Sequence, residues 1–497
     1  MLAFPCCFET PVDRTAIAFL WLIPLVAQGQ GAARANPAIQ EDTPPSAARA
    51  QGEGAYQLAE RLGSERLWIS ALDYYAEVLK GGKGGPQYLR AVAALVDLQQ
   101  RLNDQYLIPN LLALSFDSSW NALPPESIAR VNYWVANVQL RRGNLDRAQT
   151  LLSAIPAADP IYPKARYLIG VVLSDPRYPG GPRYAEALAI FEAVARVAPK
   201  GQPDLQNIQE LARLGIARIH YGLRQYAKAV AAYDSVPRFS RYWNQSLFEN
   251  GFARFQNEDP GGALGSLQSL HAPQFSGAFE PESWILKATL YYFNCLYEES
   301  RGSLKEFEEI YLPIWGALLP WAESKGLSVL EYFQAISLPD PRIPRPVLLW
   351  IRNHERLMGV FELLRQIDRE KAAIERSSAW KGNPLEAELL ASLEQNADTV
   401  RQIAGQFAKN RILEASQNIK TFSDQAEIIR FEIVKAEKEL AEMGVDQRKI
   451  FESQTLYRPA MPAEDWNYWK FQGEFWIDEI GYYQYTLKRG CPAEGRE

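Results

Sequence analysis

Side chains suited to acid–base or metal chemistry are few in this chain and lie far apart in its sequence. The 497 residues include three histidines, His220, His271 and His354. Glu355 follows His354, but no second histidine completes the H-E-x-x-H pattern of a zinc site. A C-x-x-C pair and the G-x-S-x-G turn of a serine hydrolase do not occur either. We therefore expect no catalytic, metal-binding or cofactor-binding residues and no enzymatic activity.

Residues 80–87, KGGKGGPQ, have the composition of a phosphate-binding loop. They lack the G-x-x-x-x-G-K-[ST] spacing and follow a helical pattern, so we interpret them as a turn between helices. The net charge of −6 argues against nucleic acid as a partner, because a basic face is needed to displace counterions from phosphates. The same charge disfavours binding to an anionic membrane surface.

Aromatic side chains are concentrated near the C-terminus. Residues 466–485, WNYWKFQGEFWIDEIGYYQY, hold nine of them, which would make a sticky patch if all were exposed. Three interpretations are open: a strap on an uncovered helical seam, a docking surface for a partner, or a platform for carbohydrate such as peptidoglycan. Glu474, Asp478 and Glu479 lie among the rings, but a glycosidase needs two carboxylates at a defined separation across a cleft. The candidate partner-binding residues of this segment are Trp466, Trp469 and Trp476.

The elements that must position these side chains are helices. A small residue recurs with a bulky residue three positions before it and another four after it, as in Tyr226-Ala229-Tyr233. From Ala148 onward the copies are spaced by 39, 42, 34 and 37 residues. A second small residue lies twelve positions ahead of the first in five copies, and seventeen ahead in one copy with an insertion. Such pairs let the axes of consecutive antiparallel helices approach closely. The expected packing residues are Ala59, Ala71, Ala136, Ala148, Gly170, Ala187, Ala217, Ala229, Gly251, Ala263, Ala288 and Ser300.

This pattern resembles the tetratricopeptide repeat (TPR), a helix–turn–helix unit of about 34 residues. The stretch 141–148, RRGNLDRA, is similar to the turn between the two helices of that unit, with Gly143 suited to a helix end. The resemblance covers roughly residues 52–338, although the copy at 87–121 has Leu98 where a small residue is expected. A generic α-solenoid outside the family is the alternative.

The resemblance implies a superhelix whose concave groove holds an extended peptide or a helix of a partner protein. Groove residues would come from polar positions of the first helix of each unit, between the packing residues. The candidates are Asn132, Gln139, Arg213, His220, Asn250 and Arg254.

Four prolines in residues 339–346 predict a semi-rigid joint. Residues 347–378 and 385–442 are almost free of Pro and Gly, so we expect two long helices that fold back as an antiparallel hairpin. A heptad seam runs along the second helix, which is typical of a coiled coil. Because the first helix is shorter, the C-terminal segment, a second subunit or another protein must cover part of this seam. Its positions are Ala415, Ile419, Phe422, Ala426, Ile429, Ile433, Ala436 and Leu440.

The apolar run 16–27, AIAFLWLIPLVA, is too short to span a bilayer and suits a secretory signal. Ala33-Arg34-Ala35 offers a cleavage site, with a short buried helix as the alternative and a start near Val12 also open. Cys6 and Cys7 would leave with the signal. The remaining Cys295 and Cys491 could pair in an oxidising periplasm, but they form no disulfide framework, so we expect two free or loosely placed thiols.

The sequence thus predicts an all-α protein with a TPR-like α-solenoid followed by a long coiled-coil hairpin. The expected segments are a signal peptide (1–35), a disordered linker (36–51), repeats (52–338), the joint (339–346), the hairpin (347–450) and an aromatic segment (451–497). The signal, repeats and aromatic segment together resemble exported TPR proteins of myxobacteria and related bacteria, some of which belong to envelope-spanning motility or export assemblies. We expect a periplasmic scaffold that binds proteins of an envelope complex, with self-association through the coiled coil as a further possibility. The alternative function is a peptidoglycan-binding anchor.

Overall fold

The structure, a computed structural model, describes residues 53–83, 85–197, 203–275, 277–442, 444, 474–485 and 487. Eighteen α-helices and two short 3-10 helices, η1 (Ser118–Ala122) and η2 (Pro273–Phe275), form its regular structure. None of the described residues lies in a strand, so the fold is all-α, as the sequence predicts. The predicted signal peptide and linker, together with Trp466 and Trp469, lie outside the described residues.

Two compact units share these helices. Unit 1 comprises Met1–Gly222 and Met358–Val400, and unit 2 comprises Leu223–Leu357 and Arg401–Glu497. Each unit therefore combines helices of the repeat region with part of the long helices that follow the proline-rich joint. A cut of the chain at residue 340 would divide both units.

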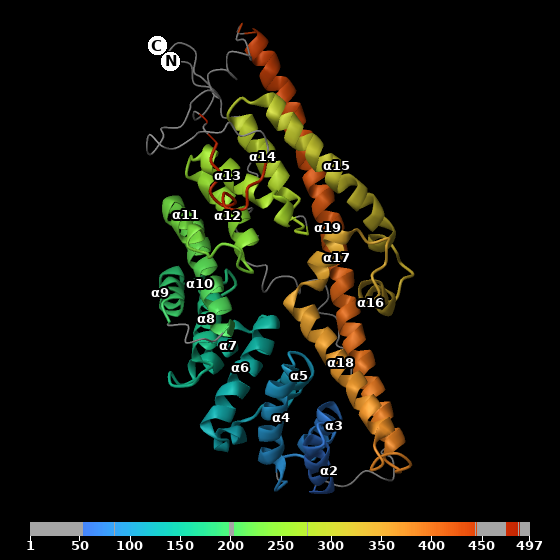
Figure 1. Cartoon of the computed structure of the whole chain (residues 1–497). Helices are drawn as coiled ribbons and strands as arrows, with labels where there is room; N and C mark the ends of the chain where they lie inside the picture. Colours follow the sequence, from blue (N-terminus) through green and yellow to red (C-terminus); the bar gives the residue numbers. More distant parts are fainter. Residues whose placement is uncertain are drawn as a thin grey trace. The chain divides into compact units, whose positions relative to one another are not determined.

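Consecutive helices pack in pairs within each unit (Figure 1). In unit 1 the pairs are α2 (Glu53–Ser64) with α3 (Trp68–Lys80), α4 (Tyr88–Leu102) with α5 (Leu107–Ser115), α6 (Pro125–Arg141) with α7 (Leu145–Ser153), and α8 (Tyr162–Ser174) with α9 (Tyr184–Ala195), and α10 (Pro203–Gly222) packs on α8 and α9. In unit 2, α11 (Tyr226–Asp234) packs on α12 (Trp243–Gln256), which pairs with α13 (Pro260–Leu270), and α14 (Glu282–Phe293) pairs with α15 (Tyr297–Ala322). The copy with Leu98 in place of a small residue thus also forms a helix pair, α4–α5.

One turn conformation recurs ahead of five of the helices. The residue two positions before α3, α7, α11, α13 and α15 has a φ between 57° and 80°; these residues are Arg66, Gly143, Arg224, Glu258 and Cys295. In four of these turns the residue that follows completes a Schellman motif or its equivalent, since its N–H donates at 2.9 Å to the carbonyl five residues earlier. The donors are Leu67, Asn144, Asp259 and Leu296. A left-handed residue other than glycine costs about 1–2 kcal/mol, which the closed turn offsets.

The twelve expected packing residues all lie inside the units, and none of their side chains is exposed. The Phe191 ring packs against Gly170 on α8 and Gly215 on α10. A Cβ added at Gly170 would lie 2.6 Å from this ring, and one added at Gly215 would lie 2.8 Å from it. In unit 2 the Ser300 hydroxyl donates to the Ala288 carbonyl at 2.8 Å. Small residues therefore lie where a neighbouring helix comes closest, as ridges-into-grooves packing requires.

Beyond the repeat pattern, α15 continues through Pro313 and Pro320 to Ala322. A capping box formed by Ser328 and Glu331 then starts α16 (Val329–Ser337). The proline-rich segment ends in α17 (Arg345–Arg352), so its last prolines begin a helix rather than only separating two segments.

The long helices are α18 (Glu355–Arg376) and α19 (Glu386–Glu442). The helix predicted for 347–378 is divided at Asn353–His354 into α17 and α18. In unit 1, Lys371 of α18 forms an ion pair with Glu394 of α19 on the far side of the connecting turn, which makes the two helices antiparallel there. In the turn itself, the buried Trp380 donates its indole N–H to Glu65 at 2.6 Å.

In unit 2 the seam of α19 lies beside α15 (Figure 1). Arg301 of α15 pairs with Glu437, and Arg430 pairs with Glu308 of α15. All eight seam positions from Ala415 to Leu440 are buried or half-buried. A repeat helix of the same chain therefore covers the part of the seam for which the sequence left three candidates.

Candidate functional site

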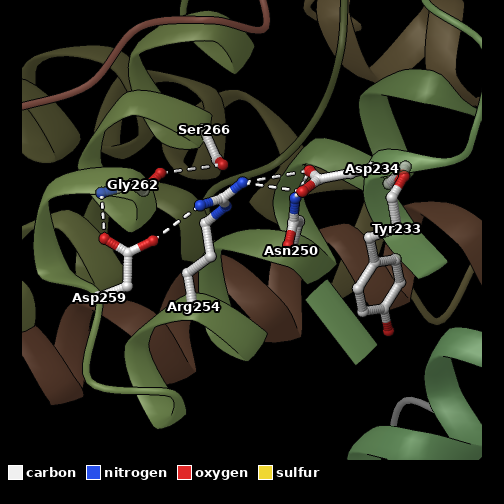
Figure 2. Close-up of polar contacts among 8 residues, drawn as sticks. Tyr233, Asp234, Asn250, Arg254, Asp259, Gly262 and Ser266 are labelled. Carbon is white, nitrogen blue, oxygen red and sulfur yellow. Dashed lines mark hydrogen bonds and ion pairs between the residues drawn. The ribbon is translucent and has the colours of Figure 1, made fainter. Parts of the chain in front are cut away.

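Arg254 on α12 is the centre of a polar network in unit 2 (Figure 2). Its guanidinium donates to the Asp259 carboxylate at 2.7 Å and to the Asp234 carboxylate at 3.0 and 3.2 Å. Asn250, one turn earlier on α12, also donates to Asp234 at 2.7 Å. Asp259 in turn caps the start of α13 by accepting from the Gly262 N–H at 2.8 Å. The network thereby joins the end of α11, the middle of α12 and the start of α13.

The other groove candidates lie mostly inside unit 1. Asn132 and Gln139 on α6 and His220 on α10 are buried, and Arg213 is half-buried. Gln139 accepts a hydrogen bond from Asn144 in the following turn at 2.7 Å. Gln139 therefore helps to fix the turn between α6 and α7. Among the predicted partner-binding residues that the structure describes, Trp476 is the most open, with 58% of its surface exposed.

Histidine chemistry near neutral pH is not available at two of the three histidines. Burial, reinforced by Lys287, lowers the pKa of His271 to about 3, and the ring stacks on Trp284 at 3.8 Å. Burial and Arg411 lower the pKa of His354 to about 4. Both imidazoles are therefore neutral at pH 7. No group of three or more His, Cys, Asp or Glu side chains in the described part of the chain could hold a metal ion.

Two half-buried glutamates of unit 2 have carboxyl pKa values far above the ordinary range. Burial, followed by repulsion from Glu249, raises the pKa of Glu280 to about 8, although Arg411 opposes the shift. Burial and Glu280 raise the pKa of Glu282 to about 8 as well. Raised carboxyl pKa values are common at functional sites. In the described part of the chain no group of metal ligands accompanies them, and their clearest consequence is for stability.

The described part of the aromatic segment, residues 474–485, packs on α13 (red in Figure 1). The Tyr485 N–H donates to the Gly261 carbonyl at 3.1 Å, and its hydroxyl donates to Gln268 at 3.3 Å. The Gly481 N–H donates to the Ser269 hydroxyl at 2.8 Å. These residues are a strap, but on a repeat helix and not on the α19 seam.

Glycines of α13 let the strap backbone come into direct contact with the helix. A Cβ at Gly261 would lie 2.1 Å from the Tyr485 carbonyl oxygen, and one at Gly265 would lie 1.7 Å from that of Tyr483. With Ser269 they occupy every fourth position and so lie on one face of α13. Gly481 of the strap has a φ of 95° and would place a Cβ 2.6 Å from Trp243. Larger side chains are therefore excluded on both sides of the contact.

Arg238, in the loop between α11 and α12, holds the first turn of the strap. Its guanidinium donates to the carbonyls of Ile477, Asp478 and Ile480, the last at 2.6 Å. It also lies 4.3 Å from the centroid of the Tyr482 ring. Residues 476–480 form a helical turn, so the cation lies at its carbonyl end, where the helix dipole is negative. The Ile480 side chain is fully buried.

The docked strap leaves an apolar patch exposed around Arg238. Its members are Phe239, Trp476, Ile477 and Tyr482, which are 57%, 58%, 64% and 69% exposed. Phe239 adopts a φ of 58°, which is unusual for a bulky residue and occurs here outside the recurring turn between helices. The carboxylates of Asp478 and Glu479 border the patch and are exposed. We call Phe239, Trp476, Ile477 and Tyr482 the Arg238 patch.

Sequence reasoning missed Arg238 and the glycine face of α13. A signal for the latter exists: α13 reads PGGALGSLQSL, and three glycines in one short helix are costly unless something requires a close approach. For Arg238 no local signal exists, because its acceptors lie about 240 residues away in sequence.

Cys295, at the turn between α14 and α15, is disulfide-bonded. The expectation of a free thiol at this position is therefore wrong, since one separated pair suffices for a bond without any larger disulfide framework. The other cysteines, Cys6, Cys7 and Cys491, lie outside the described residues.

No helix in the described part of the chain is both long enough and apolar enough to cross a bilayer. No protein-family model matches the sequence, and neither does any curated protein. Among solved structures, the chain is similar to a tetratricopeptide repeat protein from Parabacteroides merdae ATCC 43184, with 13% sequence identity and a TM-score of 0.33. The similarity covers 52% of this chain and 92% of that chain. At this TM-score it carries no argument, and the repeat interpretation rests on the helix pairs and their recurring turn.

Proposed function

We propose that this chain is a non-enzymatic scaffold of the TPR type that binds partner proteins in the bacterial cell envelope. The observation that carries the proposal is the series of helix pairs from α2 to α15 with one recurring turn. Stacked helical pairs of this kind expose extended surfaces and are used in proteins mainly for binding other proteins.

Unit 2 offers the surface best suited to a partner. The Arg238 patch places four large apolar side chains in solvent, and isolated patches of this kind commonly mark interaction sites. Exposed aromatic residues are also typical of binding hot spots. The bordering carboxylates of Asp478 and Glu479 favour a partner that combines apolar with basic side chains.

Export to the periplasm is part of the proposal. The apolar run 16–27 suits a secretory signal, and the disulfide at Cys295 supports an oxidising compartment, because disulfides are rare in the reducing cytosol. Fractionation of cells that make the chain with a C-terminal tag tests this part. Recovery of the tagged chain from the cytosol alone, at its full precursor mass, contradicts export.

Affinity purification of the full chain from envelope extracts tests the scaffold role. We expect a protein that co-purifies with the wild-type chain and is lost when Trp476 and Tyr482 are changed to Ala together. Leu338→Ala is the matched control, because Leu338 is 80% exposed and lies outside the Arg238 patch. The full chain is needed, since both units combine segments from the two sides of residue 340.

A second function, peptidoglycan binding, has one observation in its favour: the rings of Trp476 and Tyr482 are exposed and could stack on sugars. If the chain retains no protein but sediments with purified peptidoglycan, and the double Ala variant does not, the scaffold proposal is wrong. The chain is then an anchor to the cell wall.

A further inference from the structure

The surface that holds the strap recognises general features of a peptide segment. These features do not depend on where the segment lies in this chain. Arg238 binds the carbonyl end of one helical turn, and the buried contact of Ile480 requires an aliphatic side chain at the end of that turn. The close approach of Trp243 requires glycine at the next position. The hydroxyl of Tyr485 then reaches Gln268 of α13 and also hydrogen-bonds to Tyr291 of α14.

The residues that contact the strap all come from a part of the chain that is distant from it in sequence. Arg238, Gly261, Gly265 and Ser269 all belong to the α11–α13 region, and their strap partners lie 212 or more residues away in sequence. We call these four residues the strap seat. Because the glycines of the seat disfavour the helix that they belong to, their presence in α13 follows from the need to admit a peptide backbone.

We propose that the strap seat is a binding site for an extended protein segment with the pattern aliphatic–Gly–x–x–x–Tyr, preceded by one helical turn. In this structure residues 480–485, IGYYQY, of the chain itself fill the site. A partner protein that carries such a segment competes with the strap for the seat. The inference goes beyond the proposed scaffold function, because a segment bound at the seat displaces the strap, whereas a partner held at the Arg238 patch requires the docked strap.

The connection through the chain gives the strap an advantage over any free segment. A tethered ligand acts at an effective concentration that reaches the millimolar range for short flexible linkers. A partner segment therefore binds well only when the strap is weakened or when the partner is held nearby by a second contact. The Arg238 patch, formed in part by the docked strap, would be dismantled by the exchange.

A labelled peptide with the sequence of residues 474–487 tests the site on the full chain. In the first variant, Gly481→Val, a β-branched side chain must adopt a φ of 95° beside Trp243, so the chain's own strap leaves the seat. We expect the wild-type peptide to bind this variant at least tenfold more tightly than it binds the wild-type chain. A peptide that carries the same Gly481→Val change should not bind either chain. Hydrogen exchange at the Gly481 and Tyr485 amides shows whether the strap is seated in each chain, and Ile480→Ser is the second release variant.

Gly265→Ala in the released chain identifies the seat. A methyl group at this position would lie 1.7 Å from the backbone oxygen of residue 483, so peptide binding should be lost. The helix itself favours alanine over glycine, so the variant is expected to fold, which circular dichroism melting checks. Gly302→Ala is the matched control, because a Cβ at Gly302 of α15 meets nothing within 4 Å and binding should be unchanged.

Two results would overturn the inference. One is equal affinity of the peptide for the wild-type and released chains, and the other is full binding by the folded Gly265→Ala chain. Neither result touches the scaffold proposal if the wild-type chain still retains a protein that the Trp476 and Tyr482 double variant loses. If no chain, wild type or variant, retains a protein while the labelled peptide still binds, the scaffold role is refuted and the strap seat remains supported as a peptide-binding site.

Discussion

The carboxylate of Glu370 on α18 accepts a hydrogen bond from the backbone N–H of Ile69 at 2.9 Å, in the first turn of α3. The same carboxylate accepts from the Ser70 N–H at 3.1 Å. Leu67, the residue before α3, has no side chain that could cap the helix. A residue 301 positions away in sequence thus supplies the cap, and its negative charge lies at the positive end of the helix dipole.

Removal of this cap should destabilise unit 1. Glu370→Ala leaves two buried N–H groups without an acceptor, so we expect a loss of about 2–4 kcal/mol in the free energy of unfolding. Glu370→Gln keeps one acceptor oxygen and should lose about half as much. Urea denaturation followed by circular dichroism measures both values. Glu375→Ala, at an exposed position of the same helix, is the control and should stay within about 0.5 kcal/mol of the wild type.

Stability should fall between mildly acidic and mildly alkaline pH because of Glu280 and Glu282. Burial raises both pKa values from 4.5 to about 8, so in this window the folded chain keeps protons that the unfolded chain has released. A folded state that binds more protons loses stability as the pH rises. Glu280→Gln removes one of the two groups and part of the repulsion on the other. Its melting temperature should therefore decline less than that of the wild type from pH 5 to pH 8, and parallel declines would refute the assignment.

Arg254 should contribute more to the free energy of unfolding than an ordinary surface cation does. Arg254→Ala leaves the carboxylates of Asp234 and Asp259 without their shared partner, and we expect a loss of about 1–2 kcal/mol. Arg254→Lys should recover only part of it, because an ammonium group cannot reach both carboxylates as the guanidinium fork does. Thermal unfolding gives the comparison. Lys305→Ala, which breaks an exposed pair with Glu309 on one helix face, should change stability by less than about 0.5 kcal/mol.

The disulfide at Cys295 should make the chain sensitive to reductant. Reduction is expected to lower the free energy of unfolding by about 2–5 kcal/mol, as for other native disulfides. The melting temperature measured with and without dithiothreitol tests this. Cys295→Ser should melt at the temperature of the reduced wild type and show no further response to dithiothreitol. Modification of Cys295 itself by maleimide before reduction, located by peptide mapping, would contradict the bond.

The repeat was predictable because its signal is local and recurs. In five copies the two small residues are twelve positions apart, and the turn between two helices depends on a few neighbouring residues such as Gly143. The all-α class followed from the same periodicity. The continuation of α15 through Pro313 was not predictable in this way, since proline ends most helices and only the surrounding packing overrides that preference.

The remaining features of the fold and of the candidate site depend on long-range contacts. The residues around each such contact give no local signal of it in the sequence. Glu370 sits on a helix with many charged residues, and nothing near it indicates that it is buried against the start of α3. A strap on the α19 seam is one of the three interpretations that the sequence leaves open for the aromatic segment, and no local signal shows that α15 pairs with the seam through Arg301 and Glu437. A polar residue between the packing positions of a first helix need not line a groove, since Asn132 and Gln139 are buried inside unit 1.

The division of unit 1 into two stretches of chain also sets an order of events during synthesis. Helices α2 to α10 emerge first, yet residues 358–400 that complete their unit follow only after all of 223–357 has been made. At about 5–20 residues per second, that interval lasts on the order of 10–40 s. Unit 1 therefore cannot be completed until residues 358–400 have been made, well after helices α2 to α10.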